Sequence, residues 1–180
     1  MQYKPFPAYV DFHRSRDTLR RLRGPRGSGK TTAAINEIGF LLPKFMFDSY
    51  RIAKTRWVVI TLDSRNLASG FMHFFPDAQY IQSAGRMLIK HGEIEVEILF
   101  PSPSAYEHKY YKMPIGPDGK RHIEWHLDVS FPSLMSLEMT GYFIESCGEE
   151  HRDILRKTLN MRIGRYPPMV PVRFGIEEEQ

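Results

Sequence analysis

One short segment limits what this chain can fold into more than any other feature of its sequence. Residues 24–31 read GPRGSGKT and match the pattern G-x-x-x-x-G-K-[ST] in full. In such a loop the glycines let backbone N–H groups surround an anion, and the following helix points the positive end of its dipole at that anion. The segment therefore predicts a phosphate-binding loop between a strand and a helix; a glycine-rich turn without a ligand is the alternative.

The residues of this loop have separate expected roles. Lys30 is expected to reach the β- and γ-phosphates of a nucleotide, and the Thr31 hydroxyl to bind the Mg²⁺ that bridges them. The chemistry implies ATP and Mg²⁺ as cofactors. The expected nucleotide-binding set is Gly24, Pro25, Arg26, Gly27, Ser28, Gly29, Lys30, Thr31 and Thr32.

The flanks of the loop carry the patterns that such a loop requires. Residues 18–23 form a short run that contains a β-branched residue and stops at Gly24, which favours a strand over a helix. From Lys30 to Leu42 apolar residues recur at helical spacing, and Pro43 is expected to end that helix.

Strand and helix patterns alternate along the rest of the chain. Continuous apolar runs at 57–62 and 141–144 indicate strands that are buried on both faces, and 170–176 indicates one more strand. Three further segments are expected to be helices: 64–75, which Pro76 closes, 134–137 and 149–161.

Two hairpins are expected between these elements. The first spans 86–100 and turns at His91-Gly92, and the second turns at 117–119. The predicted fold class is α/β, with a mainly parallel central sheet, helices on both of its faces, and inserted β-hairpins. Without internal repeats or a linker, residues 1–180 are expected to form a single domain.

Composition excludes several classes of protein. A chain of 180 residues that is 42% hydrophobic and 26% charged is an ordinary globular one, not a disordered one. Its single cysteine, Cys147, excludes an internal disulfide and a thiolate-rich zinc site. No apolar stretch has the length of a membrane span, and the N-terminus lacks a signal-peptide core. The net charge is +4, and basic residues are concentrated between Arg14 and Lys30.

Phosphoryl transfer also needs an acid on a neighbouring strand. Two carboxylates follow apolar runs: Asp63 comes after the run at 57–62, and Glu145 comes directly after 141–144. The short apolar run that exits into Glu145 has the better form, so Glu145 is the expected Mg²⁺-binding and catalytic acid. A strand-terminal acid that faces solvent is the alternative.

Five segments together resemble a known family. They are 12–15 (FHRS), 23–38 (RGPRGSGKTTAAINEI), 55–60 (TRWVVI), 136–145 (SLEMTGYFIE) and 162–168 (RIGRYPP). In this order, and over almost the whole chain, they resemble the large terminase subunit of tailed bacteriophages, and more narrowly the ATPase domain of that DNA-packaging motor. The segments at 136–141 and 162–167 are the specific ones.

The resemblance implies an additional-strand P-loop fold that couples ATP hydrolysis to translocation of double-stranded DNA into a procapsid. It implies a portal protein and a small terminase subunit as partners, a ring of identical subunits on the portal, and the cytoplasm of the infected host, without a membrane. Carried over by position, Glu145, Arg26 and Lys30 become the catalytic residues, with Arg26 sensing the γ-phosphate, and Thr31 and Glu145 the Mg²⁺ ligands. An outward-facing charge is the alternative for Arg26.

The sequence departs from the family in three places. The acid that ends 141–144 is followed by Ser146, where relatives have a catalytic glutamate, so either Glu145 does both jobs, Glu149 assists, or hydrolysis is weak. The run at 57–60 exits into residues 61–63 (TLD) instead of Arg-Asn-Thr. Third, a Ser/Thr-rich coupling motif and a nuclease domain are expected to be missing after Ile176, as in a fragment, a split gene or a degenerate copy.

Other groups of residues have weaker interpretations. His122, Glu124, His126 and Asp128 alternate along one strand, too far apart to ligate one metal ion together, so a solvated face is expected. The arginines at 14–23 are candidates for contact with DNA phosphates, although at least one of Arg20 and Arg21 is expected to pair with an acid. Cys147 is expected to be a packing residue. Arg162 and Arg165 are candidates to act on a neighbouring subunit's nucleotide, or to form surface ion pairs.

Two other functions share the phosphate loop. A P-loop kinase of small metabolites would share residues 24–31, but 100–135 lacks an arginine-rich lid. A non-catalytic module that uses ATP as a conformational ligand is favoured by Ser146.

Overall fold

Seven strands form the central sheet of the computed structural model, which describes residues 3–101, 108–112, 114–121, 124–128, 134, 136–147, 149–168 and 173–179. Their order across the sheet is β1-β9-β8-β2-β5-β4-β3. The first five are parallel, and β4 and β3 are antiparallel to their neighbours. The bounds are Leu19–Leu22 (β1), Lys54–Ile60 (β2), Gln79–Ile81 (β3), Arg86–His91 (β4), Ile94–Leu99 (β5), Gly141–Ile144 (β8) and Phe174–Glu178 (β9).

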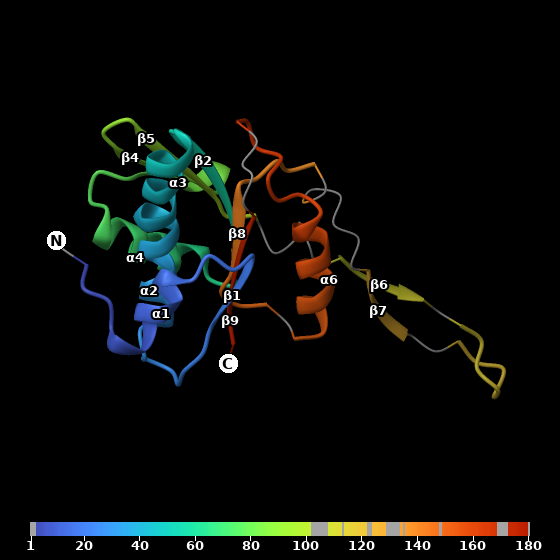
Figure 1. Cartoon of the computed structure of the whole chain (residues 1–180). Coiled ribbons are helices and arrows are strands. Elements are labelled where there is room, and N and C mark those ends of the chain that lie inside the picture. Colours follow the sequence, from blue (N-terminus) through green and yellow to red (C-terminus); the bar gives the residue numbers. More distant parts are fainter. Residues whose placement is uncertain are drawn as a thin grey trace.

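Helices cover both faces of this sheet (Figure 1). Helices α1 to α4 lie on one face and α6 on the other, so the expected α/β fold class is confirmed. The helical elements are η1 (Pro7–Tyr9), α1 (Val10–Arg14), α2 (Lys30–Asn36), the π-helix η2 (Glu37–Leu41), α3 (Leu42–Tyr50), α4 (Ser64–Phe74), η3 (Gln82–Ala84) and α6 (Glu149–Asn160). Within the described ranges, no helix combines the length and the apolar character that crossing a membrane requires.

The inner strands are buried on both sides, as their apolar runs predict. Trp57, Val58, Val59 and Ile60 are all fully buried. Because side chains alternate along a strand, Trp57 and Val59 join the core under α1–α4, while Val58 and Ile60 join the core under α6. Each such side chain contributes about 1.5–3 kcal/mol relative to exposure, so the sheet holds both helical layers.

The expectation that Pro43 ends the first long helix is wrong. The helical path continues from α2 through η2 into α3, where Pro43 occupies the first turn. Proline has no N–H for the carbonyl of Gly39, four residues earlier. The wider π-turn accommodates this loss, since Leu42 N–H bonds to the Glu37 carbonyl, and the His91 ring lies beside the turn, against the ring of Phe40.

Both expected hairpins are present, but they have different places in the fold. The hairpin of β4 and β5 belongs to the main sheet, because β5 pairs in parallel with β2. Strands β6 (His108–Lys112) and β7 (Glu124–Asp128) form a separate two-stranded sheet that lies beyond α6 in Figure 1.

Other boundaries follow the expectations, with small differences. The strand expected at 170–176 is β9, which runs on to Glu178, while 169–172 lie outside the described residues. The short helix expected at 134–137 falls partly on residues that are not described. A single domain over the whole chain stays a prediction.

Candidate functional site

The phosphate loop joins β1 to α2 and holds its glycines in left-handed backbone conformations. The backbone angle φ is +147° at Gly24, +77° at Gly27 and +86° at Gly29. A β-carbon at Gly29 would also lie 2.7 Å from the ring of Phe6. The positive φ therefore favours glycine at Gly29, and the loop has the shape that its sequence predicts.

Side chains brace this loop from within and from η1. Lys30 Nζ donates to the carbonyl oxygens of Gly24 at 2.6 Å and Pro25 at 3.2 Å, so its ammonium group lies over the loop. Ser28 Oγ and the Tyr9 hydroxyl share a hydrogen bond of 2.8 Å. The charge of Lys30 is thereby held where an anion in the loop would meet it.

The loop forms one wall of a cavity of about 770 Å³, which is within the usual range for a small-molecule site. The residues that line it are Gly24, Pro25, Arg26, Gly27, Ser28, Gly29, Lys30, Thr31, Thr32, Leu62, Glu145, Ser146 and Glu178. All nine expected nucleotide-binding residues and the expected acid Glu145 thus face one cavity. Arg26 is exposed at its edge, and its role toward a γ-phosphate stays a prediction.

Glu145 lies at the carboxyl end of β8, as its position after an apolar run predicts. Its Oε2 accepts hydrogen bonds from Thr61 Oγ1 at 2.7 Å and from Ser146 Oγ at 2.6 Å. Ser146 Oγ in turn accepts from the backbone N–H of Leu62 at 3.0 Å. Ser146 therefore holds Glu145 in place. The side chain of Glu149, the other candidate, lies outside the described residues.

Asp63, the competing acid, has a different job. It is the N-cap of α4, where its Oδ1 accepts the backbone N–H of Asn66 at 3.1 Å. A capping carboxylate satisfies a helix N–H that has no partner within the helix. Asp63 also does not line the cavity, so the geometry favours Glu145 as the acid of this site.

Glu178 is a site residue that the sequence analysis missed. It ends β9, the strand between β1 and β8, and only 7% of its surface is exposed. Its Oε1 accepts a hydrogen bond from Thr31 Oγ1 at 2.7 Å. The strand predicted from the sequence stops at Ile176, so the acids at 177–179 fall outside it. The strand in fact continues to Glu178, and this continuation is the signal that could have identified Glu178.

The electrostatics of the cavity reflect its two carboxylates. Burial is the main cause that raises the pKa of Glu178 above its usual range, and the charge of Glu145 raises it further. The hydrogen bond from Thr31 and the charges of Lys30 and Arg152 act in the opposite direction. A cation bound between the carboxylates would relieve both the burial and the repulsion.

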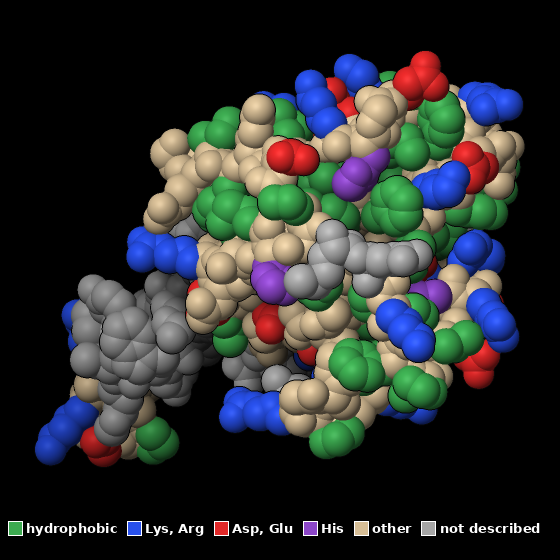
Figure 2. Space-filling model, turned by 90° about the vertical axis from the view of Figure 1, so that its left-hand side faces the viewer, with side chains coloured by type: hydrophobic (Ala, Val, Ile, Leu, Met, Phe, Trp, Pro, Cys, Tyr) green, Lys and Arg blue, Asp and Glu red, His purple; other side chains and the backbone are tan. Residues whose placement is uncertain are grey.

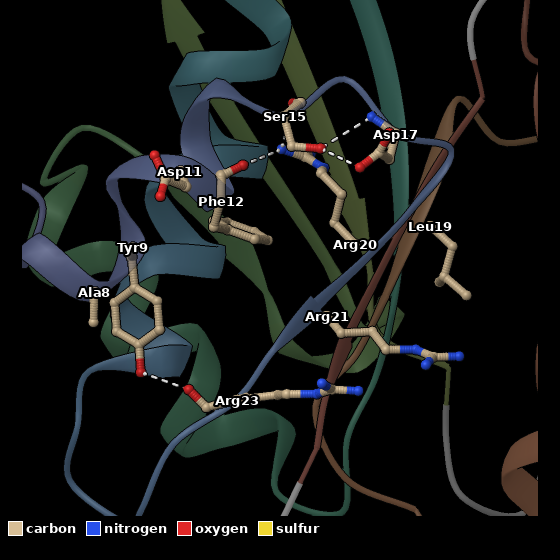
Figure 3. Close-up of a pocket in the computed structure, with 10 residues that line it drawn as sticks. All are labelled: Ala8, Tyr9, Asp11, Phe12, Ser15, Asp17, Leu19, Arg20, Arg21 and Arg23. Atoms are coloured by element: carbon tan, nitrogen blue, oxygen red, sulfur yellow. Dashed lines mark hydrogen bonds between the residues drawn. The ribbon is translucent and has the colours of Figure 1, made fainter.

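Three of the arginines before the loop form ion pairs within the protein. Arg20 is buried and donates to Glu37 Oε1 at 2.7 Å, which confirms that one of Arg20 and Arg21 pairs with an acid. Arg21 and Arg23 both reach the Glu179 carboxylate, at 3.0 and 2.6 Å. These arginines line a pocket of about 580 Å³ between α1 and β1. In Figure 3, Arg20 points toward Phe12, whereas Arg21 and Arg23 point away from it. Contact of these arginines with DNA stays a prediction.

The face over α1–α4 has mixed surface chemistry. Figure 2 shows Lys and Arg side chains on this face dispersed among hydrophobic and acidic ones, mostly toward its periphery. Among the side chains coloured there, no continuous basic patch gathers that would by itself mark a DNA-binding surface.

The two most specific family-like segments lie together, away from the cavity. The backbone N–H of Gly164 donates to the Met139 carbonyl at 2.8 Å, and Met139 and Ile163 form a parallel bridge. Arg162 Nε donates to the Leu137 carbonyl at 3.0 Å. Residues 136–140 precede β8, whereas Glu145 follows it, so these segments lie at the opposite end of the strands from the phosphate loop. A role of Arg162 or the exposed Arg165 on a neighbouring subunit stays a prediction.

Two other candidates add nothing to this site. His122 and the side chains of Glu124, His126 and Asp128 lie outside the described residues, and the part of the chain that is described holds no cluster of three His, Cys, Asp or Glu residues suited to a metal. Cys147 is half-buried and packs against the core under α6, in accord with a packing role.

The residues of the cavity fit Mg²⁺ with a nucleotide phosphate. A hydroxyl and two carboxylates offer only oxygen, which is what Mg²⁺ prefers. Lys30 and the first N–H groups of α2, which have no partner within the helix, offer positive charge to a phosphate. A strand, a glycine-rich loop, a helix and acids at the ends of neighbouring parallel strands define a P-loop fold.

Comparison with known proteins agrees with this class of fold. No protein-family model matches the sequence, and no curated protein matches it. The large terminase of a thermophilic bacteriophage, solved in complex with ADP, has the same fold, with a TM-score of 0.57, 9% identity, and coverage of 96% of this chain and 36% of that one. A second crystal form of that terminase gives a TM-score of 0.55, 8% identity, and coverage of 91% and 33%. The chain thus shares the terminase fold and spans about a third of the terminase chain.

Proposed function

We propose that this chain is the ATP-binding and ATP-hydrolysing part of a terminase-type motor that moves double-stranded DNA. The observation that carries the proposal is the cavity in which the phosphate loop, Thr31 and Glu145 face one another on a terminase fold. That a terminase of this fold was solved in complex with ADP supports the nucleotide as ligand.

In this proposal each residue of the cavity has a defined task. Lys30 and the loop N–H groups bind and orient the β- and γ-phosphates, and Thr31 and Glu145 hold Mg²⁺. The metal, when bound, neutralises charge that develops on the phosphate oxygens. Glu145, which Thr61 and Ser146 fix in place, also orients the attacking water. Arg26 at the edge of the cavity senses the γ-phosphate.

The partners belong to the same proposal. A motor of this class acts as a ring of identical subunits on a portal protein, receives DNA from a small terminase subunit, and works in the cytoplasm of the infected host. Attraction to DNA phosphates would make its DNA response weaken steeply with salt.

A test compares nucleotide binding with turnover. ATP·Mg²⁺ affinity is measured by calorimetry, and phosphate release is measured at several protein concentrations, with and without duplex DNA, with Lys30→Ala as the control. Turnover that rises with DNA and with protein concentration is expected. A chain that binds no nucleotide, or a turnover that is the same with and without DNA, contradicts the proposal.

A non-hydrolysing nucleotide module is the second candidate, and Ser146 at the position after Glu145 favours it. The same experiment separates the two functions, because this module would bind ATP tightly and release no phosphate under any of these conditions.

A further inference from the structure

We propose that Glu178 positions the Thr31 hydroxyl for Mg²⁺ and supplies the second carboxylate of the nucleotide site. This inference rests on the proposed function, since it assigns a task to one more residue of the same cavity. Glu178 lines that cavity together with Glu145 and the phosphate loop.

The register of the sheet brings the two acids together. In the parallel pair of β8 and β9, Ile144 lies opposite Glu177, so the next residues along, Glu145 and Glu178, are neighbours. On its other side Glu178 pairs with Leu22, the last residue of β1 before the loop. Because β9 lies between β1 and β8, its last residue reaches both the loop and Glu145.

The hydrogen bond to Thr31 gives Glu178 its task. A hydroxyl has one proton to donate and two lone pairs. Thr31 Oγ1 donates its proton to Glu178 Oε1 at 2.7 Å, which leaves the lone pairs of Thr31 free for a cation. Metal ligands are commonly oriented by a carboxylate of this kind, and loss of such a partner lowers metal affinity about 10–100-fold.

Glu178 also supplies the second carboxylate that is absent at Ser146, the position directly after Glu145. The hydroxyl of Ser146 is bound to Glu145 and to the backbone of Leu62, so this position supports the first acid. The second negative charge comes from a different strand. The neighbours of Glu178 are ion-paired elsewhere: Glu177 with Arg156, and Glu179 with Arg21 and Arg23.

The position of Glu178 is fixed through its backbone. Its carbonyl oxygen accepts a hydrogen bond from Arg152 of α6, and the N–H of Glu179 donates to the Leu22 carbonyl at 2.9 Å. These bonds hold the end of β9 against both the phosphate-loop strand and α6. The carboxylate therefore approaches Thr31 from a rigid element.

The test measures ADP affinity with saturating Mg²⁺ and with a chelator in place of the metal. ADP is not hydrolysed, so the readout is independent of turnover. The variants are Glu178→Ala and Glu178→Gln, and the matched control is Glu179→Gln, which removes the same charge one residue away. Thermal unfolding of each variant shows whether it folds, and Glu178→Gln, which keeps the side-chain volume, carries the test if Glu178→Ala does not.

The expected effect on ADP affinity differs between the two conditions. With Mg²⁺ the Glu178 variants bind ADP about 10–100-fold more weakly than the unmodified chain. Without Mg²⁺ they bind it as tightly or more tightly, because a negative charge beside the phosphates has been removed. Glu179→Gln behaves like the unmodified chain in both conditions.

Three outcomes overturn the inference. A gain in affinity from Mg²⁺ that is unchanged in both folded variants shows that Glu178 plays no part in metal binding. An equal loss with and without Mg²⁺ shows a merely structural role, and the same effect in Glu179→Gln shows a general effect of charge. If the unmodified chain binds no ADP in either condition, the proposed function itself fails, and this inference fails with it.

Discussion

The two ends of the parallel strands differ in the residues that lie there. At the carboxyl ends of β1, β8 and β9 lie the phosphate loop, Glu145 and Glu178, around a cavity. At the amino ends the segments 136–140 and 162–166 bond to each other and to β2, with no cavity residue among them. Ligand sites of open α/β sheets lie at the carboxyl ends, so the segments around Met139 and Gly164 stabilise the framework and form no part of the site.

Arg56 of β2 is the centre of the amino-end framework. Its Nε reaches the largely buried Glu97 carboxylate, and its guanidinium lies 4.3 Å from the centre of the Tyr166 ring. Its backbone exchanges two bonds with Thr140, whose N–H donates at 2.8 Å and whose Oγ1 accepts at 3.0 Å. The two ends can therefore be changed separately, one at Lys30 and Glu145 and the other at Arg56.

The largest effect is expected from Glu145→Gln at the carboxyl end. The amide keeps the shape of the side chain and loses the charge that orients water, so turnover is expected to fall about 10²–10⁴-fold. ATP affinity, measured by calorimetry, is expected to fall less than turnover, because the amide oxygen can still ligate Mg²⁺. If Glu145→Gln left turnover unchanged and Asp63→Asn lowered it strongly, the acid of the site would have been assigned to the wrong strand.

The next largest effect is expected from Lys30→Ala, which should weaken ATP binding. The loss of charge-assisted contacts worth about 1.5–3 kcal/mol corresponds to roughly a 10–100-fold lower affinity. The free energy of unfolding should stay within about 0.5 kcal/mol, because the bonds of Lys30 Nζ within the described part of the chain go to carbonyls of its own loop. An unchanged ATP affinity and turnover would remove the phosphate-loop assignment altogether.

At the amino end, Arg56→Ala should lower stability and leave nucleotide affinity unchanged. It removes an ion pair to a buried carboxylate and a cation–π contact, so we expect a loss of about 1–3 kcal/mol in the free energy of unfolding. Denaturant unfolding measures the loss, and ADP affinity below the melting temperature should be unchanged. A large drop in nucleotide affinity of the folded variant would show that the two ends are coupled.

A smaller loss of stability is expected from Asp63→Ala. Removal of the N-cap of α4 costs about 1 kcal/mol, and Asp63→Asn, which keeps a capping oxygen, should restore most of it. Both variants should hydrolyse ATP at the rate of the unmodified chain, since Asp63 does not line the cavity. Impaired turnover of Asp63→Asn would contradict the assignment of Asp63 to helix capping alone.

The smallest expected effect is a pH dependence at the amino end. Burial lowers the pKa of His91 below its usual value of 6.5, and the bond to the Gly39 carbonyl opposes this only in part. The fold therefore favours the neutral ring, and its contribution to stability is present above pH 6.5 and is lost as the pH falls toward the lowered pKa. Unfolding at about pH 8 and about pH 5 should show a larger loss for the unmodified chain than for His91→Phe; equal losses would contradict the assignment.

The elements closest to the loop could be predicted from sequence because their signals are local. Gly24, Gly29 and Lys30 belong to one short motif, and the run that ends at Glu145 is apolar throughout. The path of the helix through Pro43 could not be predicted in this way, because it depends on a π-turn that packs against His91, a residue far along the chain. Glu178 was missed for the same reason, since only strand register brings it to Thr31.

Three consecutive acids at the end of β9 have three different neighbours. Glu177 pairs with Arg156 of α6, Glu178 accepts a hydrogen bond from Thr31, and Glu179, directly after the strand, pairs with Arg21 of β1 and with Arg23. Since side chains alternate along a strand, a one-residue insertion or deletion within Phe174–Ile176 would turn each acid to the opposite face. A deletion would place the Glu177 carboxylate at the buried position of Ile176, and an insertion would place the apolar Ile176 beside Arg156. Homologous chains should therefore tolerate substitution in this strand far better than any change in its length.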